Sequence, residues 1–330
     1  MNDLLKAYKT STSLKKKGHI KHFDIKFRSK KARSESIVIH SKHYKSRGVF
    51  YPEMFGPDPV RAAEVLPDKL NYDCRLQKTR LGEFYFCILL PLDIGSENKA
   101  PVSVFKKRRA RRRSEEQPQV AVSEVEQRIL ALDPGVRTFF TGYSPSGEVV
   151  EWGVDDICRI RRICYSIDRL QSKMGVQDNT RSRRYRLRRA FHRSIRRVRN
   201  LVDEVHKKLT RWLVLHYDVV LLPSFDVSEM VPKAHRKIGS KTARAMLTWS
   251  HYRFKQRLLD KTKEFPSCRV IVCDEHFTTK TCGQCGVLND VGASKAYSCT
   301  KCDAEFDRDV NAARNVYLRY FTLIDRSSSS

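Results

Sequence analysis

Four cysteines in the last fifth of the chain form two Cys-x-x-Cys pairs, Cys282/Cys285 and Cys299/Cys302, with 13 residues between the pairs. This spacing predicts one tetrahedral zinc site. Because four thiolates leave no coordination position open, we expect the zinc to be structural, and its binding to stabilise a segment with little core of its own. The alternative interpretation is four free or redox-active thiols.

Acidic residues flank the cysteines. Glu275 precedes the first pair, Asp307 and Asp309 follow the second, and Asp133 ends an apolar run much earlier in the chain. Carboxylates at strand ends can meet at one edge of a sheet, where three of them can hold two Mg²⁺ ions roughly 4 Å apart for phosphodiester hydrolysis. Taken alone, Asp133 before Pro-Gly has the simpler interpretation of a turn-forming residue.

The net charge restricts the partners of the chain. Lys and Arg number 65 against 37 Asp and Glu, which gives +28, and this excess favours nucleic acid first and an anionic membrane second. No apolar run approaches the roughly 18 residues of a membrane span, and of the two kinds of partner we expect nucleic acid and no membrane. The 40% hydrophobic content is that of a folded chain.

Residues 181–199 concentrate ten arginines in a stretch that can form a helix. A phosphate backbone is the natural partner of such a surface. The alternative is a solvated helix paired with acids elsewhere, although the chain is short of acids. The predicted nucleic-acid-binding residues are Arg181, Arg183, Arg184, Arg186, Arg188, Arg189, Arg193, Arg196 and Arg197.

The first part of the chain, residues 1–100, alternates β-like runs with turns and predicts a small β-rich domain with a basic face. The predicted strands are 23–27, 36–40, 72–76 and 83–92, the last two joined near Gly82. Residues 101–126 are predicted to be a disordered basic linker. Seven of the eight residues 106–113 are basic, which is typical of a nuclear localisation signal or a nucleic-acid-binding arm, or else of a solvated loop.

Residues 127–330 predict an α/β domain. Strands are expected at 128–133, 137–143, 148–152, 218–222 and 269–273, and helices within 156–216, at 246–263 and after Asp309. A basic loop is expected between the strand at 218–222 and the helix at 246. The zinc-binding segment is then an insertion at about 276–306.

Three sequence stretches resemble the TnpB family of transposon-encoded, RNA-guided nucleases. They are ALDPGVRTF (131–139), DEHFTTKTCGQCG (274–286) and CTKCDAEFDRDVNAARN (299–315), and the resemblance extends over about residues 20–320. It implies an RNase H-like (RuvC) nuclease domain with an inserted zinc ribbon, preceded by a β-barrel wedge domain. It also implies Mg²⁺-dependent cleavage of target DNA matched to a guide RNA from the transposon locus. We expect a monomer.

The resemblance also implies the catalytic residues. Asp133 matches the first catalytic Asp, and Asp309 is the expected third; Asp307 is the alternative third acid and otherwise the cap of the helix. Most bacterial members carry a Glu after the strand at 218–222, where this chain has Pro223-Ser224. Glu275 resembles the relocated Glu of the eukaryotic and viral Fanzor branch, and Glu229 is the alternative.

Members of this family usually have an additional strand and a helical recognition domain before the FDIKF-like strand, which only about 20 residues precede here. We therefore expect a truncated or degenerate copy, an incomplete gene model or a compact form. Two other functions stay open: a catalytically impaired nucleic-acid-binding remnant or regulator, and a transposase acting in DNA recombination. The polybasic run predicts the nucleus in a eukaryotic host, and otherwise the cytoplasm or nucleoid.

Overall fold

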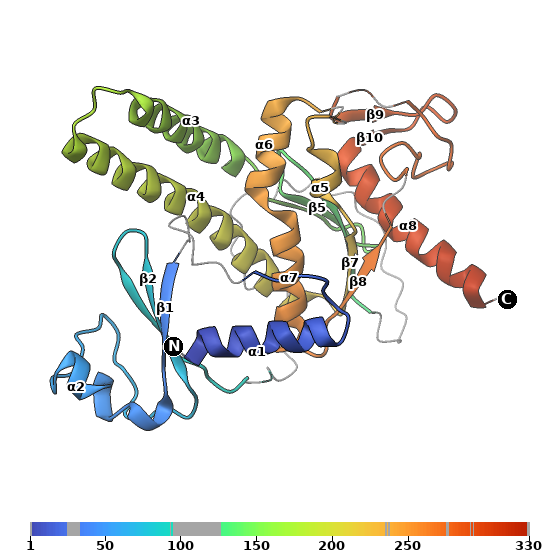
Figure 1. Ribbon diagram of the computed structural model, residues 1–330. Helices are drawn as coiled ribbons and strands as arrows, with labels where there is room; N and C mark the ends of the chain where they lie inside the picture. The colour runs from blue at the N-terminus through green and yellow to red at the C-terminus, as the bar shows by residue number, and fades with distance from the viewer. Residues whose placement is uncertain are drawn as a thin grey trace. The chain divides into compact units, whose positions relative to one another are not determined.

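The computed structural model divides into two compact units, Met1–Pro91 and Leu92–Ser330 (Figure 1). It describes residues 2–24, 34–92, 94, 127–234, 236, 238–274, 277–290, 292 and 294–328. The predicted linker with its polybasic run, residues 25–27 of the predicted first strand, and Glu275 lie outside the described residues. Among the helices of the described part of the chain, none combines the length and apolar character that crossing a bilayer requires.

The first unit contains a three-stranded antiparallel sheet in the order β1 (Ser34–Ile39), β2 (Cys74–Thr79) and β3 (Phe84–Cys87). Helix α1 (Asn2–Lys16) precedes the sheet, and two 3₁₀ turns, η1 (Ser41–His43) and η2 (Ser46–Gly48), and α2 (Pro52–Phe55) lie between β1 and β2. The small core consists of Ile39, Tyr44, Phe50, Leu70 and Cys74.

One predicted strand of this unit is shorter in the structure, and one helix was not predicted. The strand predicted over 83–92 ends at Cys87, and the leucines beyond it are exposed; Pro91 has no N–H to donate to a ladder. Helix α1 was not expected from the sequence, because its apolar side chains do not form a buried stripe and are largely exposed. The tight turn near Gly82 is confirmed, with φ of +82° at this glycine.

The second unit is built on a five-stranded sheet. The order is β6 (Val149–Trp152), β5 (Phe140–Tyr143), β4 (Ile129–Pro134), β7 (Val219–Pro223) and β8 (Arg269–Cys273). The strands from β6 to β4 are antiparallel, and β4, β7 and β8 are parallel, so that the carboxyl ends of these last three lie at one edge. The predicted mixed α/β fold is confirmed.

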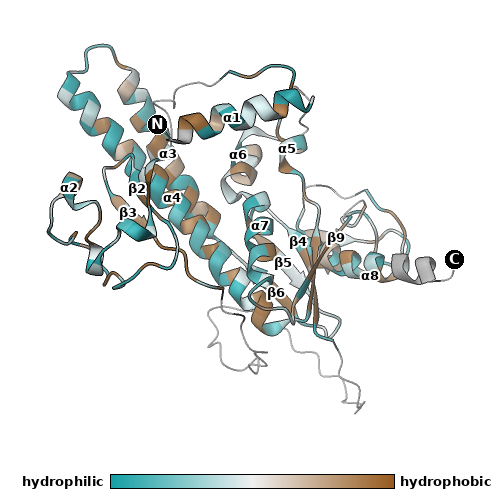
Figure 2. Ribbon diagram, turned by 60° about the horizontal axis from the view of Figure 1, so that its bottom comes forward, coloured by the Kyte–Doolittle hydropathy of each residue, from teal (hydrophilic) through white to brown (hydrophobic). Residues whose placement is uncertain are grey.

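Helices cover both faces of this sheet (Figure 1). On one face, Leu130 and Leu132 share a core with α3 (Asp156–Gly175), α4 (Arg181–His216), α6 (Ser240–Trp249) and α7 (His251–Thr262). On the other face, Ala131 and Leu221 pack against Val316 of α8 (Arg308–Ser328). Alternate residues of one strand therefore face opposite helical layers. The strands are correspondingly hydrophobic, while α4 presents hydrophilic residues on its outer surface (Figure 2).

The helices differ from expectation in two places. The arginine-rich stretch and the segment after it form one continuous helix, α4, because no glycine or proline interrupts them. The helix predicted at 246–263 is two helices that break at Ser250, whose φ of +53° is left-handed. The first of these, α6, begins at Ser240, inside the segment expected to be a loop that also contains α5 (Val227–Met230).

Candidate active site and structural zinc site

Asp133 lies at the carboxyl end of the central strand β4. Within β4, Ile129 and Ala131 pack on the α8 face of the sheet, whereas Leu130 and Leu132 face the other helices. Continuing the alternation places Asp133 on the α8 face, where it is partly buried. Its register partner on β5 is Thr141. The carboxylate is thus presented from the end of the central strand of the sheet.

The turn after Asp133 is fixed by several contacts. Gly135 donates its backbone N–H to the Phe139 carbonyl (3.1 Å), and a Cβ at Gly135 would lie 2.4 Å from the Thr138 carbonyl oxygen. The indole Nε1 of Trp249 donates to the Val136 carbonyl (3.0 Å). These contacts leave the Pro-Gly turn little freedom, so they orient the strand end that carries Asp133.

Two buried histidines pack beneath this turn. The rings of His206 and His251 stack on Phe139, each with a centroid distance of 4.9 Å. Burial, and the charge of Arg257 as the next cause, lower the pKa of His206 to about 4; burial, then His206, lowers the pKa of His251 to about 3. Both imidazoles are therefore neutral at physiological pH. They stabilise the turn by packing against Phe139.

The start of α8 carries the other predicted acids. The Oδ1 atom of Asp307 accepts hydrogen bonds from the backbone N–H groups of Asp309 (3.0 Å) and Val310 (3.4 Å), as a helix-capping carboxylate does. Its Oδ2 atom lies 3.3 Å from Lys295 Nζ. Asp309 sits in the first turn of α8, partly buried, with Oδ1 3.4 Å from Arg308 Nη2. Asp307 is thus engaged in holding the helix.

The packing of α8 brings its first turns to the face that Asp133 occupies. One turn after Asp309, Ala312 and Ala313 are buried, and their small side chains permit a close approach. Further along, Val316 packs against Ala131, two residues before Asp133. The alternation along β4 thus puts Asp133 on the sheet face that α8 covers, and Asp309 lies in the first turn of that helix.

The second predicted acid, Glu275, lies outside the described residues, so the convergence of three carboxylates remains a prediction. The ends of β7 and β8 are aligned by a hydrogen bond from Ser224 N to the Cys273 carbonyl (2.9 Å). Asp274, which follows β8, forms an ion pair with Arg319 of α8 (2.9 Å). The alternative acid, Glu229, is exposed on α5.

Among the described residues, the four cysteines are the only group of three or more His, Cys, Asp or Glu side chains close enough to share a metal ion. Their sulfur atoms lie within 4.8 Å of one another. The distances from Cys282 to Cys302 (3.7 Å) and from Cys285 to Cys299 (3.6 Å) approach the ~3.8 Å edge of a tetrahedron with Zn–S bonds of ~2.3 Å. The residues present therefore fit a Cys₄ zinc site.

Each cysteine pair lies in a tight backbone turn. Cys282 accepts at its carbonyl from Gly286 N, and Cys299 accepts at its carbonyl from Asp303 N, with left-handed φ at both Gly286 and Asp303. Strands β9 (Ala296–Ser298) and β10 (Glu305–Asp307) pair beside the second turn. Backbone N–H groups of Lys301 and Cys302 lower the pKa of the Cys299 thiol to about 6, which favours the thiolate that a metal binds.

Two asparagines of α8 tie the zinc-binding segment to the sheet domain, and the sequence pattern did not predict them. Asn311 Oδ1 accepts from the backbone N of Gly283 (2.9 Å), and Asn311 Nδ2 donates to the Thr281 carbonyl (2.8 Å). One turn later, Asn315 Nδ2 donates to the carbonyls of Thr278 (2.8 Å) and Thr281 (2.6 Å). The i, i+4 spacing of two asparagines in DVNAARN was the available signal.

The predicted nucleic-acid-binding arginines lie along the first half of α4, which Thr180 caps by accepting from Arg183 N (3.2 Å). All nine are exposed except Arg196, which is partly exposed. Arg184, Arg186 and Arg189 donate to a backbone carbonyl and two hydroxyls, none of which is charged. This part of α4 is therefore a cationic surface, and the binding of nucleic acid to it remains a prediction.

Comparison with known proteins links the chain to viral TnpB-like proteins. Residues 251–316 match the family model of the Cas12f1-like TNB domain. The TnpB-like protein L79 of Acanthamoeba polyphaga mimivirus is 29% identical over 314 residues, covering 94% of this chain and 54% of that protein. The putative transposase A625R of Paramecium bursaria Chlorella virus 1 is 29% identical over 320 residues, covering 94% of this chain and 65% of that protein. The chain thus spans about half to two thirds of these relatives.

A shorter match joins the chain to a DNA-cleaving enzyme, the CRISPR-associated endodeoxyribonuclease Cas12f1 of Sulfoacidibacillus thermotolerans. It is 27% identical over 124 residues, covering 36% of this chain and 28% of that protein. Among solved structures, a Cas12f1–sgRNA–target DNA complex matches 60% of this chain and 51% of that one, with 16% identity and a TM-score of 0.42. The chain is therefore similar to viral TnpB-like proteins over nearly its whole length, and its carboxyl-terminal part is related to Cas12f1.

Proposed function

We propose that the chain is a Mg²⁺-dependent, RNA-guided DNA endonuclease with an RNase H-like nuclease domain, of the Fanzor-like branch of TnpB proteins. What supports the proposal is the position of Asp133, at the end of the central strand whose Ala131 packs against Val316 of α8, together with the position of Asp309 in the first turn of that helix. The sheet order, with three antiparallel strands followed by two parallel ones, supports the RNase H-like assignment.

In this proposal Asp133, Glu275 and Asp309 hold Mg²⁺, whose preferred ligands are oxygen atoms. The bound metal supplies Lewis acidity and a lowered pKa for coordinated water. The chain's own residues fix the geometry: the Pro-Gly turn orients Asp133, and the Asp307 cap and the Asn311 contacts fix the start of α8. The zinc lies outside the chemistry and stabilises the segment that joins Glu275 to α8.

The arginines of α4 bind phosphates of the nucleic acid without reading its sequence. Pairing between a guide RNA and the target strand then supplies the specificity. This role is supported by the exposure of the α4 arginines and by the hydrogen bonds of Arg184 and Arg186, whose acceptors are an uncharged carbonyl and an uncharged hydroxyl. The guide is expected to be a transposon-derived RNA that binds the protein during expression.

The test is guided cleavage by protein purified with its RNA. Sequencing the copurified RNA defines the guide, and a matched DNA with randomised flanks serves as substrate in Mg²⁺. The wild type and Glu229→Ala should cleave, whereas Glu275→Ala should not. Cleavage by Glu275→Ala would contradict the assignment of that glutamate. Guide binding without cleavage by the wild type in Mg²⁺ or Mn²⁺ would favour a regulator, and a joined DNA product would favour a transposase.

A further inference from the structure

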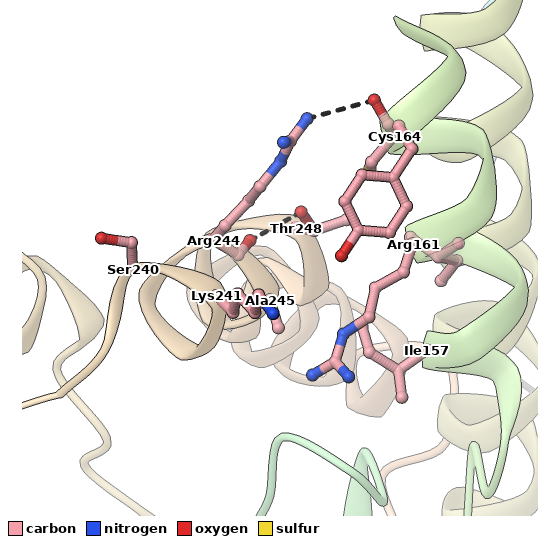
Figure 3. Close-up of a pocket in the computed structure, with 10 residues that line it drawn as sticks. Ile157, Arg161, Cys164, Ser240, Lys241, Arg244, Ala245 and Thr248 are labelled. Carbon is pink, nitrogen blue, oxygen red and sulfur yellow. Dashed lines mark hydrogen bonds between the residues drawn. The ribbon is translucent and has the colours of Figure 1, made fainter. Parts of the chain in front are cut away.

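A pocket of about 170 Å³ opens between α3 and α6, and its lining residues do not include Asp133 or Asp309 (Figure 3). Ile157 and Ile160 of α3 and Ala245 of α6 form an apolar wall, and Tyr165, which is 53% exposed, lies beside them. The volume is close to that of protein cavities of roughly 150 Å³ that hold one benzene ring. The pocket can therefore accept one flat aromatic group.

Three cationic side chains belong to the same pocket, and they differ in their partners. Arg244 is held by both carboxylate oxygens of Asp168, at 2.6 and 2.8 Å, so its charge is balanced. Arg161 extends from α3 into the space between the helices (Figure 3). Within the described part of the chain, neither Arg161 nor Lys241 has a carboxylate partner. The pocket thus combines an apolar slot with two positive charges that lack counter-ions among the described residues.

We propose that this pocket binds one unpaired nucleotide of the nucleic acid that the chain holds, with the base in the apolar slot against Tyr165 and the phosphate near Arg161 and Lys241. A nucleotide joins an aromatic ring to an anion, which matches the two parts of the pocket. The inference rests on the nucleic-acid binding of the proposed function, and it adds a contact to a single base.

A peptide with an aromatic residue between acidic residues has similar chemistry, but the surroundings of the pocket favour a nucleotide. Helix α3 packs along α4, so the pocket belongs to the same helical hairpin as the arginine-rich stretch (Figure 1). A polyanion bound along α4 carries many phosphates close to α3. The net charge of +28 favours the same class of partner over a short acidic peptide.

The experiment compares two RNA–DNA duplexes of about 20 base pairs, the length of a guided heteroduplex, in buffer without Mg²⁺. Both carry the fluorescent base 2-aminopurine, which is paired in one duplex and unpaired in the other. The full chain should bind the duplex with the unpaired base about tenfold more tightly and should change its fluorescence. Tyr165→Leu should remove most of this preference, and Thr248→Trp, which puts a large side chain at a lining position, should remove it without weakening binding of the paired duplex.

The charge contact is tested by the double substitution Arg161→Gln/Lys241→Gln, which should also reduce the preference. Matched controls are Tyr252→Leu on α7 and Arg169→Gln on α3, both exposed and outside the pocket, and these should keep it. Circular dichroism establishes that each variant is folded. A second readout is ultraviolet crosslinking of an unpaired 4-thiouridine, which should reach Tyr165 in the wild type.

Equal affinity of the wild type for the two duplexes would overturn the inference, as would an unchanged preference in Thr248→Trp. The chain could instead bind a glutamate-rich peptide with an aromatic residue more tightly than it binds the duplex with the unpaired base. If that binding depended on Tyr165, it would overturn the inference in favour of a protein partner. If the preference is lost while guided cleavage persists, only the pocket assignment fails. If the preference holds while guided cleavage is absent, only the proposed nuclease activity fails.

Discussion

Asn311 of α8 accepts a hydrogen bond of 2.9 Å from the backbone N–H of Gly283, which lies between the first two zinc-site cysteines. The same side chain donates to the Thr281 carbonyl at 2.8 Å. Asn311 is two residues after Asp309, so a single side chain links the metal-binding segment to the helix turn that carries the third predicted acid. The zinc segment is therefore hydrogen-bonded directly to the first turns of α8.

The first prediction concerns this link. Asn311→Ala leaves the buried N–H of Gly283 without its acceptor, which should lower the free energy of unfolding by about 1–3 kcal/mol. The matched control is Asn200→Ala on the exposed side of α4, which should change stability by less than about 0.5 kcal/mol. Urea unfolding of both variants is the measurement. Equal stability of the two variants would show that the link contributes nothing.

The second prediction concerns zinc removal. Purified protein should contain one zinc ion per chain, and Cys299→Ser should lose it, because the thiolates are the ligands. Hydrogen exchange of backbone amides should then accelerate by at least about tenfold over residues 277–290 and the first turns of α8, which the zinc segment supports. Cys158→Ser, at an exposed cysteine of α3, is the control and should retain both zinc and protection. Full protection in zinc-free protein would contradict a structural role.

The third prediction follows from the buried histidines. The pKa of His206, about 4, lies below its ordinary value of 6.5, so the unfolded chain binds more protons than the folded one between these pH values. Stability should therefore fall as pH drops from 6.5 towards 4, by roughly 3 kcal/mol for His206 alone. His251, with a pKa of about 3, acts in the same direction.

Unfolding measured at several pH values checks this dependence. His206→Gln removes the titrating group but keeps a donor that can reach the Trp249 carbonyl, which His206 contacts at 2.9 Å. The free energy of unfolding of this variant should depend less steeply on pH. Between pH 4 and 6.5 its unfolding should take up fewer protons than that of the wild type, by up to about one. An unchanged slope would show that His206 is not held neutral.

The fourth prediction concerns the cationic surface of α4. Replacing Arg184, Arg188, Arg193 and Arg197 with Gln should weaken nucleic-acid binding irrespective of sequence. The slope of the logarithm of the binding constant against the logarithm of the salt concentration should become shallower, by roughly 0.9 for each phosphate that is no longer neutralised. Lys208→Gln and Lys263→Gln, whose side chains already pair with Glu204 and Asp260, serve as controls. A slope that stays at the wild-type value would exclude phosphate contacts by these arginines.

The sequence predicted the features that depend on local pattern. Apolar runs ending in acids identified β4 and β8, and the cysteine spacing identified a cluster whose sulfur distances suit zinc. It missed the break between α6 and α7, because Ser250 is neither Gly nor Asn, the residues that commonly adopt the left-handed conformation it has here. It also missed the Asn311 contacts, since the carbonyls and N–H groups that they satisfy lie about 30 residues away in the chain.

The choice between Asp309 and Asp307 gives the sharpest test of the proposed active site, because the two residues have different contacts. Asp307→Ala removes a helix cap, which should cost about 0.5–2 kcal/mol of stability, and should leave guided cleavage measurable. Asp309→Asn should preserve stability and reduce guided cleavage by at least about a hundredfold, because it removes a predicted metal ligand. Cleavage at the wild-type rate by Asp309→Asn, in protein that retains zinc and RNA, would contradict the proposed active site.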